Sequence, residues 1–579
     1  MSDDLKHECA VAMVVLRKPL PAEAGDFGGA KLSLLLEKQH NRGQDGAGAA
    51  ILDAHPEPGE SPYWISKSAS ATPLADVLAA ISRRKRNAER IFLGHLRYAT
   101  FGKNDDAFCH PFVHQASELE HTLILAGNFN LTNTPELFER YSRQGEFPTS
   151  KADGYLIAEL VAHELSRGSN LADALSKALA DADGAWTLCG MTGDGWAFAT
   201  RDPHGIRPGY CLIDDDVVVV ASERPAIQAA FNVPPESVRE LPPGQALLVS
   251  PSGEVQMAEL CSVKQPHTPC AFERIYFSRA NDADIHRERK ALGAALLPDI
   301  LKAAKADLPD IFFSYIPNSA RIAFHGLLEE LLQERLRTST PSSEASSLTI
   351  PRFGEVAVKD AKFRTFIADA TARSEFYKHI YDVTYGLVRP GQDTLVVLDD
   401  SIVRGNTMRD AILPMLDRLG PKRIVVASSA PPIRYPDCYG IDMSTLGELV
   451  AFRALVHLLG EGAEGELRSA IASPAGIAPD QDPLAPLYAR FTEEQHSAEI
   501  ARLLTPPGMK AEVAVVFQTV GNLRRCLKPL TPPLAPKTQN SSYAVGDWCF
   551  SGNYPTPGGY KVLRKALQNY LDRKNERSY

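Results

Sequence analysis

The chain lacks the features that direct proteins to membranes, nucleic acids or oxidising compartments. No apolar run approaches the roughly 18 residues of a membrane-spanning helix, and the opening MSDDLKHECAVA lacks the basic-then-apolar order of a signal peptide. The net charge is −9 without a basic block, which argues against a nucleic-acid surface. The nine cysteines are scattered, which favours reduced thiols. We therefore expect a cytoplasmic protein that binds neither nucleic acid nor membrane.

What is present indicates a large globular chain with two main domains. Its 579 residues are too many for one core, and 44% hydrophobic with 23% charged residues is an ordinary composition. Residues 9–262 alternate β-rich runs with helical stretches and end near a hairpin at ALLVSPSGEVQM. In residues 270–455 strands lead into helices, which predicts a parallel α/β sheet. Helices and Pro-rich loops predict a helical extension at 456–579.

The strongest local feature is the string LVVLDDSIVRGNT at 395–407. Leu395–Leu398 predict a buried parallel strand, and Asp399 and Asp400 follow at its carboxyl end, where open α/β sheets bind ligands. The residues from Ser401 to Thr407 then turn the chain into a helix, and the backbone N–H groups of such a turn bind anions. An acidic turn without a ligand is the alternative for a bare strand followed by two aspartates.

The complete string closely resembles the signature of type I phosphoribosyltransferases. The resemblance implies that phosphoribosyl diphosphate is bound by the two aspartates and the turn, and that Mg²⁺ bridges its diphosphate. The implied ligand-binding residues are Asp399, Asp400, Ser401, Arg404, Gly405, Asn406, Thr407 and Arg364, the last at the start of a closing loop. The implied metal-contacting residues are Ser319, in YIPNSAR, with Asp399 and Asp400.

Five motifs occur in order in the first half of the chain. They are HECAVAMVVL, NRGQDGAG, GHLRYATFG, AGNFNLTN and DPHGIRP. Together they resemble the class II glutamine amidotransferase domain, an N-terminal-nucleophile hydrolase, and imply an αββα sandwich. Combined with the phosphoribosyl half, the resemblance is to the glutamine phosphoribosylpyrophosphate amidotransferases, over roughly residues 7–455.

This resemblance assigns roles to residues of the first half. Cys9 matches the nucleophile, whose free α-amine acts as the base at a pKa of roughly 7.7–8.0. Arg97 matches the residue that binds the glutamine carboxylate, and Asp153 the residue that binds its ammonium. Asn128 and the backbone N–H of Phe129 match the oxyanion hole.

The chain departs from the family pattern at several of these positions. Eight residues precede Cys9, so we expect removal of Met1–Glu8 to free its amine. Ala10 and Phe129 stand where the family has glycine, and the Phe129 side chain is expected to alter the backbone angles. In the second half, Asp382 stands in a stretch that is basic in the family, where Arg364, Arg373 or Lys378 are candidates to compensate.

Some members of the family carry a [4Fe–4S] cluster on four cysteines. Cys270 and Cys549 lie in matching contexts, and Cys438 is one place from a third cysteine. Gly546 stands at the fourth position, although Cys526 is an alternative. Because such clusters favour four thiolates, a cluster and three ordinary thiols both stay open.

The implied function is glutamine-dependent formation of 5-phosphoribosylamine, the first committed purine intermediate. Ammonia would pass through an interior channel to C1 of the ribose, purine nucleotides would inhibit, and the protein would be a homo-oligomer. One rival is a glutamine-dependent sugar-phosphate aminotransferase, against which residues 395–407 argue. The others are a non-catalytic sensor of phosphoribosyl diphosphate or nucleotides and an ammonia-only enzyme with an impaired glutaminase, which Phe129 and Asp382 keep open.

Overall fold

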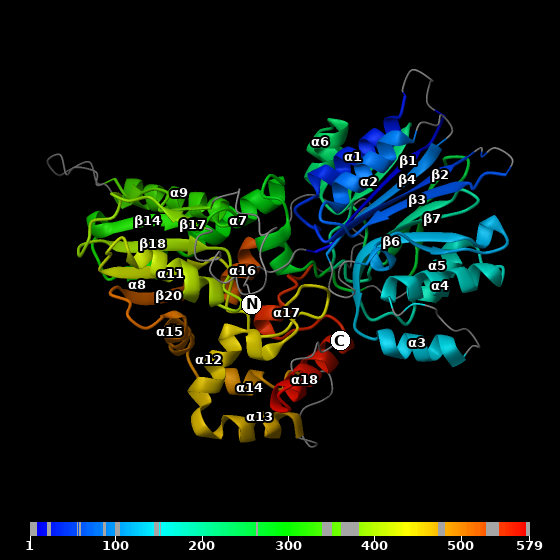
Figure 1. The fold of residues 1–579 in the computed structure, drawn as a ribbon. Coiled ribbons are helices and arrows are strands. Elements are labelled where there is room, and N and C mark those ends of the chain that lie inside the picture. Colours follow the sequence, from blue (N-terminus) through cyan, green and yellow to red (C-terminus); the bar gives the residue numbers. More distant parts are fainter. Residues whose placement is uncertain are drawn as a thin grey trace.

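The computed structural model places the two halves of the chain side by side, with the last helices beneath and between them (Figure 1). It describes residues 8–19, 25–54, 56, 59–84, 89–98, 105–143, 150, 152–261, 265–338, 350–359, 381–472, 481–528 and 543–574. Within these ranges no helix is long and apolar enough to cross a membrane.

The first half contains two antiparallel sheets. One has the order β11 (Val238–Glu240), β9 (Tyr210–Ile213), β10 (Val217–Ala221), β1 (Ala10–Leu16), β4 (Glu89–Arg97), β2 (Gly46–Asp53) and β3 (Tyr63–Ser68). The other has the order β13 (Val255–Glu259), β12 (Gln245–Val249), β8 (Ala197–Arg201), β7 (Gly184–Thr192), β6 (Leu123–Leu131) and β5 (Phe112–His114).

Strand β1 explains why these sheets are stacked. Its alternate side chains Val11, Met13 and Val15 belong to the core between the sheets, while Ala12 and Val14 belong to the core beneath the helices. Both faces of β1 are therefore buried, which is why its sequence is a continuous apolar run.

Helices cover the outer face of each sheet. Helices α1 (Phe27–Lys38), α2 (Pro73–Arg83) and α6 (Arg224–Phe231) cover the first sheet. Helices α3 (Thr134–Arg143), α4 (Asp153–Ser166) and α5 (Leu171–Leu179) cover the second. The predicted αββα sandwich is confirmed.

The second half is built on a parallel sheet, as predicted. The strand order is β15 (Arg352–Phe353), β14 (Ile311–Tyr315), β18 (Thr394–Asp399), β19 (Arg423–Ser428) and β20 (Glu512–Phe517). Helices α8 (Leu297–Ala304) and α9 (Arg321–Thr338) cover one face, with α7 (Ala283–Ala295) packed on α9. Helices α11 (Leu413–Asp417), α12 (Val450–Leu459) and α15 (Glu493–Leu504) cover the other. A separate ribbon pairs β16 (Ala357–Lys359) with β17 (Tyr381–Val383).

The helical extension expected at 456–579 is wrong in one respect, because the segment also contains a strand of the parallel sheet. Strand β20 pairs in parallel with β19, from Arg423 opposite Glu512 to Ser428 opposite Phe517, and completes the sheet. The partner of a parallel strand lies far away in sequence, so the short run EVAVVF gave no local sign of its pairing.

The remaining C-terminal segments join the two halves. They contain α13 (Ala463–Ala472), α14 (Ala485–Tyr488), α16 (Val520–Cys526), α17 (Trp548–Ser551) and α18 (Pro557–Leu571). Leu563 and Trp548 share a core with Ile206 of the first half and Cys270. The carboxylate of Asp183 also accepts hydrogen bonds from Thr556 Oγ1 at 2.7 Å and from the Gly558 N–H at 2.9 Å.

Candidate active sites

The predicted nucleophile, Cys9, lies directly before β1. The N–H of Tyr98 donates to its Sγ at 3.4 Å. Burial raises the pKa of the Cys9 thiol to about 11, although the positive charge of Arg97 opposes the shift. With its nitrogen in a peptide bond to Glu8, Cys9 is therefore a neutral thiol near pH 7 and has no amine to act as its base.

The predicted oxyanion-hole residues lie next to each other in β6. Phe129 opposes Trp186 of β7, and both backbone groups of Trp186 are engaged by Asp202. The Trp186 N–H donates to Asp202 Oδ2 at 3.2 Å, and its C=O accepts from the Asp202 N–H at 3.0 Å. The Phe129–Trp186 pair is therefore of the non-hydrogen-bonded kind, so the Phe129 N–H faces the opposite edge of β6.

The Phe129 side chain is accommodated by glycine elsewhere. A Cβ on Gly154 would meet the rings of Phe129 and Phe112 at 2.6 Å, so both rings pack over this glycine. Phe129 itself lies within a regular strand, a conformation that does not require glycine. The expectation that its side chain alters the backbone angles is therefore wrong.

Arg97 and Asp153, the predicted glutamine-binding residues, come from different elements. Arg97 ends β4, is buried, and stacks its guanidinium 5.9 Å from the ring of Phe108. Asp153 begins α4 and accepts a hydrogen bond from the Gly154 N–H at 2.9 Å. Burial raises the pKa of Asp153 to about 6, so its carboxylate becomes neutral in mildly acidic solution.

This pKa predicts how glutamine use depends on pH. If Asp153 binds the glutamine ammonium, only its ionised form attracts it, so below about pH 6 kcat/KM for glutamine should fall by about tenfold per unit more than protonation of the Cys9 α-amine alone would cause. Steady-state glutaminase assays from pH 5 to 8 measure this extra slope. In the Asp153→Asn variant the extra slope should disappear while KM is raised at every pH; an unchanged slope would assign the titration to another group.

Sequence reasoning did not find the buried ionic cluster next to Cys9. Arg42 Nε donates to Glu223 at 2.9 Å, its Nη1 lies 3.4 Å from Glu8, and its Nη2 contacts Glu273. Glu8 also pairs with Arg207, and Asn128 Nδ2 donates to Glu8 at 3.4 Å. The residue that precedes the predicted nucleophile is thus held by two buried arginines and by the asparagine of the predicted oxyanion hole. Glu8, Arg42, Asn128 and Arg207 fell within the five sequence motifs, but Glu223 and Glu273 did not.

The structure brings Ser319, Asp400 and Ser401 of the predicted phosphoribosyl residues together at the carboxyl ends of two strands of the parallel sheet. Strands β14 and β18 are neighbours, with Tyr315 opposite Leu398, so the turns that follow them are adjacent. Ser319 in the first turn hydrogen-bonds the carboxylate of Asp400 in the second. Ser401 Oγ also donates to Asp400 at 2.9 Å, and burial raises the Asp400 pKa. Buried Arg289 of α7 lies outside every sequence motif and supplies a positive charge that opposes this shift.

The turn from 401 to 407 passes through a left-handed residue at Gly405. This residue has φ +79°, a conformation that favours glycine, and a Cβ there would lie 2.3 Å from the side chain of Leu504. Asn406 and Thr407 then begin the helical segment.

Arg404 is engaged elsewhere. Its Nε donates to Glu448 at 2.8 Å and its Nη2 to the backbone oxygen of Asp442 at 3.2 Å. We therefore assign its side chain to a structural ion pair. Arg364, Arg373 and Lys378 lie outside the described residues, and Asp382 is exposed on β17.

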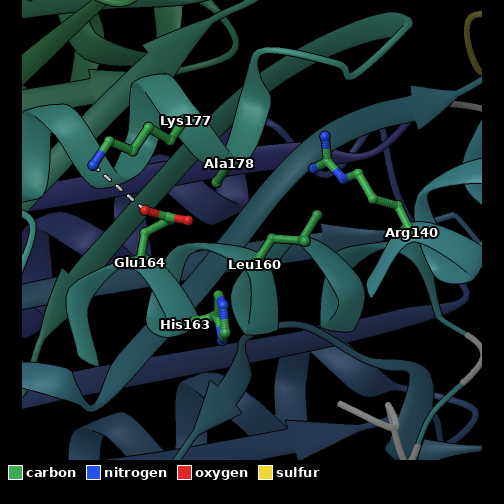
Figure 2. A pocket seen from close by; sticks show the side chains of 6 residues that line it. All are labelled: Arg140, Leu160, His163, Glu164, Lys177 and Ala178. Carbon is green, nitrogen blue, oxygen red and sulfur yellow. Dashed lines mark ion pairs between the residues drawn. The ribbon is translucent and has the colours of Figure 1, made fainter. Parts of the chain in front are cut away.

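A small cavity on the outer helices is not part of either site. Its volume is about 130 Å³, and it is lined by Arg140, Leu160, His163, Glu164, Lys177 and Ala178 from α3, α4 and α5 (Figure 2). None of the predicted catalytic or binding residues borders it.

The three predicted cluster cysteines converge, but around a carboxylate. Cys270, Cys438 and Cys549 are all buried, and burial together with the charge of Asp437 raises the pKa of each thiol. Asp437 accepts hydrogen bonds from the N–H groups of Tyr439 at 2.9 Å and Ile441 at 2.7 Å. It also accepts one from Trp548 Nε1 at 2.9 Å.

These residues do not fit a four-cysteine cluster. A Cβ at Gly546 would lie 2.5 Å from the ring of Trp548 and 2.6 Å from the carbonyl oxygen of Pro269, so a cysteine has no room there. Both oxygens of Asp437 are already hydrogen-bonded. Cys526 lies at the end of α16 and is partly buried against the hydrophobic core that contains the three thiols.

Comparison with known proteins first gives the class. Residues 105–229 match the family model described as "Glutamine amidotransferase domain". With the phosphoribosyl-type turn on the second sheet, the chain is a glutamine amidotransferase joined to a phosphoribosyltransferase.

Relatives of known sequence then give the family. The amidophosphoribosyltransferase of Bacillus subtilis is 31% identical over 369 residues, which cover 62% of this chain and 69% of the relative. That of Pasteurella multocida is 29% identical over 463 residues, 77% of this chain and 83% of the relative. The chain belongs to the amidophosphoribosyltransferase family and is an enzyme of purine biosynthesis that uses glutamine as its nitrogen donor.

A solved structure agrees on the fold. The B. subtilis glutamine phosphoribosylpyrophosphate amidotransferase complexed with ADP and GMP superimposes with a TM-score of 0.66 at 24% identity, covering 95% of this chain and 97% of that chain.

Proposed function

We propose that Cys9 hydrolyses glutamine in the first half and that the ammonia attacks phosphoribosyl diphosphate at the Asp399–Thr407 turn in the second. Diphosphate leaves from C1 of the ribose and 5-phosphoribosylamine forms. The observation that carries this proposal is the convergence of Ser319, Asp400 and Ser401 at the carboxyl ends of two neighbouring parallel strands.

The glutaminase requires cleavage of the Glu8–Cys9 bond and loss of Met1–Glu8. The freed α-amine then takes the proton from the Cys9 thiol, whose pKa of about 11 makes such a base necessary. The sulfur attacks the glutamine amide carbon, ammonia leaves, and water hydrolyses the thioester to glutamate. Asn128 Nδ2 and the Phe129 N–H donate to the oxyanion, while Arg97 and Asp153 bind the α-carboxylate and α-ammonium.

Ser319, Asp399 and Asp400 are the residues that would hold Mg²⁺, a hard cation that prefers oxygen ligands. The ion would neutralise charge on the departing diphosphate. The aspartates accept hydrogen bonds from the ribose hydroxyls, and the N–H groups around Gly405, with Thr407, bind the 5′-phosphate. We propose that residues 9–262 form the glutaminase domain and that the second domain extends from 270 past β20.

Purine nucleotides are proposed as inhibitors. The solved B. subtilis relative is complexed with ADP and GMP. A nucleoside monophosphate carries the same 5′-phosphoribosyl group as the substrate, so the turn at 401–407 can bind it. The interior ammonia channel and the homo-oligomer stay predictions.

We infer that this chain holds no iron–sulfur cluster. The Trp548 ring fills the space beside Gly546, and Asp437 already joins the surrounding loops through hydrogen bonds. Anaerobically purified protein should contain less than about 0.1 iron per chain and lack broad absorbance near 400 nm, because three thiols with raised pKa values do not supply four thiolates. About four irons with matching acid-labile sulfide would contradict this inference.

One assay tests the proposed function. The protein is incubated with phosphoribosyl diphosphate and Mg²⁺, and diphosphate release is followed with glutamine or ammonia as the nitrogen source. We expect release with both. Diphosphate release with ammonia alone would refute the glutaminase assignment. Binding of phosphoribosyl diphosphate without release of diphosphate would favour the alternative of a non-catalytic sensor.

A further inference from the structure

The edge of β6 next to the oxyanion hole is not covered by a strand. Strand β5 pairs with β6 only from Phe112 to His114, opposite Leu123–Leu125. Two positions further along, Gly127 pairs with Leu188 of β7 on its other side, but in the described residues no strand lies beside it on the edge that β5 occupies. A buried backbone N–H and C=O at such an edge need other partners.

Two buried histidines supply these partners. His95, on β4 of the other sheet, has Nε2 3.0 Å from the carbonyl oxygen of Gly127. The Gly127 N–H donates to His110 Nδ1 at 3.2 Å. The two rings stack, with centroids 3.9 Å apart and an interplanar angle of 11°. Gly127 is thus held on both of its backbone groups by one stacked pair.

The backbone determines where the protons lie. A carbonyl only accepts, so Nε2 of His95 carries a proton, and an N–H only donates, so Nδ1 of His110 does not. Burial lowers the pKa of both rings, that of His95 to about 3, which keeps the pair neutral near pH 7. Two stacked imidazolium ions would repel each other, so this neutral state is what permits the stack.

The pair also determines the direction of the Phe129 N–H. In a strand, residues two positions apart direct their backbone groups to the same edge. Gly127 directs its N–H to the two histidines, so Phe129 directs its N–H to the same side. The His110 ring is also 5.4 Å from the Phe129 ring, which adds a side-chain contact to this alignment.

We propose that His95 and His110 are positioning residues of the glutaminase, which hold Gly127 so that Asn128 and the Phe129 N–H form the oxyanion hole. This proposal rests on the proposed role of Asn128 and Phe129. The histidines transfer no proton to substrate. Their rings supply the hydrogen bonds to Gly127 that a longer β5 would otherwise make, and so hold this part of β6 in place.

Paired variants separate this role from general packing. His110→Leu removes the acceptor, while His110→Asn keeps an oxygen near the position of Nδ1. His95→Leu removes the donor, while His95→Gln keeps an N–H near the position of Nε2. Glutaminase kcat and KM, ammonia-dependent diphosphate release and thermal midpoint are measured for each.

We expect each leucine variant to lower glutaminase kcat about 10²-fold with KM within about threefold of wild type, since oxyanion donors act in the transition state. The Asn and Gln variants should recover most of kcat, and ammonia-dependent release should be unchanged. Equal kcat values within a pair, or a parallel fall of both activities, would overturn the proposal. Wild-type protein that uses ammonia but not glutamine would overturn the assignment of the oxyanion hole and the positioning role with it.

Discussion

Replacing Asp400 by Asn should lower phosphoribosylamine formation about 10³-fold with either glutamine or ammonia, while glutamine hydrolysis persists. Asp400 is the carboxylate on which Ser319 and Ser401 converge, so the variant loses the charge that a magnesium–diphosphate complex needs. Diphosphate release and glutamate formation, measured in parallel, give the two rates.

The stability of the Asp400→Asn variant separates this effect from misfolding. Burial raises the Asp400 pKa, so the folded state is destabilised by the ionised group at neutral pH. A neutral amide removes that cost, and the thermal midpoint should not fall. The matched control is Asp410→Asn, which removes an exposed carboxylate paired with Arg409 shortly after the same turn. If both variants kept wild-type activity, the phosphoribosyl site would lie elsewhere.

The Cys9→Ala variant should lose glutamine-dependent activity by at least about 10⁴-fold and keep ammonia-dependent activity. Without its thiol the chain cannot form the thioester with glutamine. If release of Met1–Glu8 is autocatalytic, the thiol is also needed to cleave the bond to Glu8, so this variant should retain the segment. Assays with each nitrogen donor, together with intact mass and amino-terminal sequencing, measure both effects.

Cys261→Ala is the control for this variant, because Cys261 is a partly exposed cysteine of the first half outside the site. It should be processed and active. Wild-type protein that hydrolyses glutamine at full rate while retaining Met1 would refute the processing step. A Cys9→Ala variant that still used glutamine would refute the assignment of Cys9 as the nucleophile.

Sequence reasoning was most successful where function depends on a continuous segment. The strand, the two aspartates and the glycine turn of 395–407 are adjacent in the chain, and the structure has a strand ending at Asp399 and a left-handed Gly405. It was less successful for pairings between distant segments. Strand β20 was taken as part of a helical extension, and Arg404 was placed among the residues that bind phosphoribosyl diphosphate, although its side chain pairs with Glu448.

The oxyanion hole illustrates the same limit. The sequence shows Phe129 where the family has glycine, which suggested a distorted backbone. The glycine that makes room for the Phe129 ring is Gly154, at the start of a helix 25 positions away. The sequence does not show this, because only the folded chain packs the Phe129 and Phe112 rings against Gly154. The histidine pair likewise comes from separate segments, His95 from β4 of one sheet and His110 from the bend just before β5 of the other.

The sequence by itself determined the two folds and the family resemblance, because each depends on short motifs whose backbone geometry is local, and it selected the candidate reacting groups in the same way. Only the tertiary structure decided what surrounds those groups. In the folded chain Glu8 is buried between two arginines, and Trp548 and Asp437 occupy the space among the three cysteines. These arrangements follow from packing and from the cost of burying unpaired charges and polar groups, which act between residues distant in the chain.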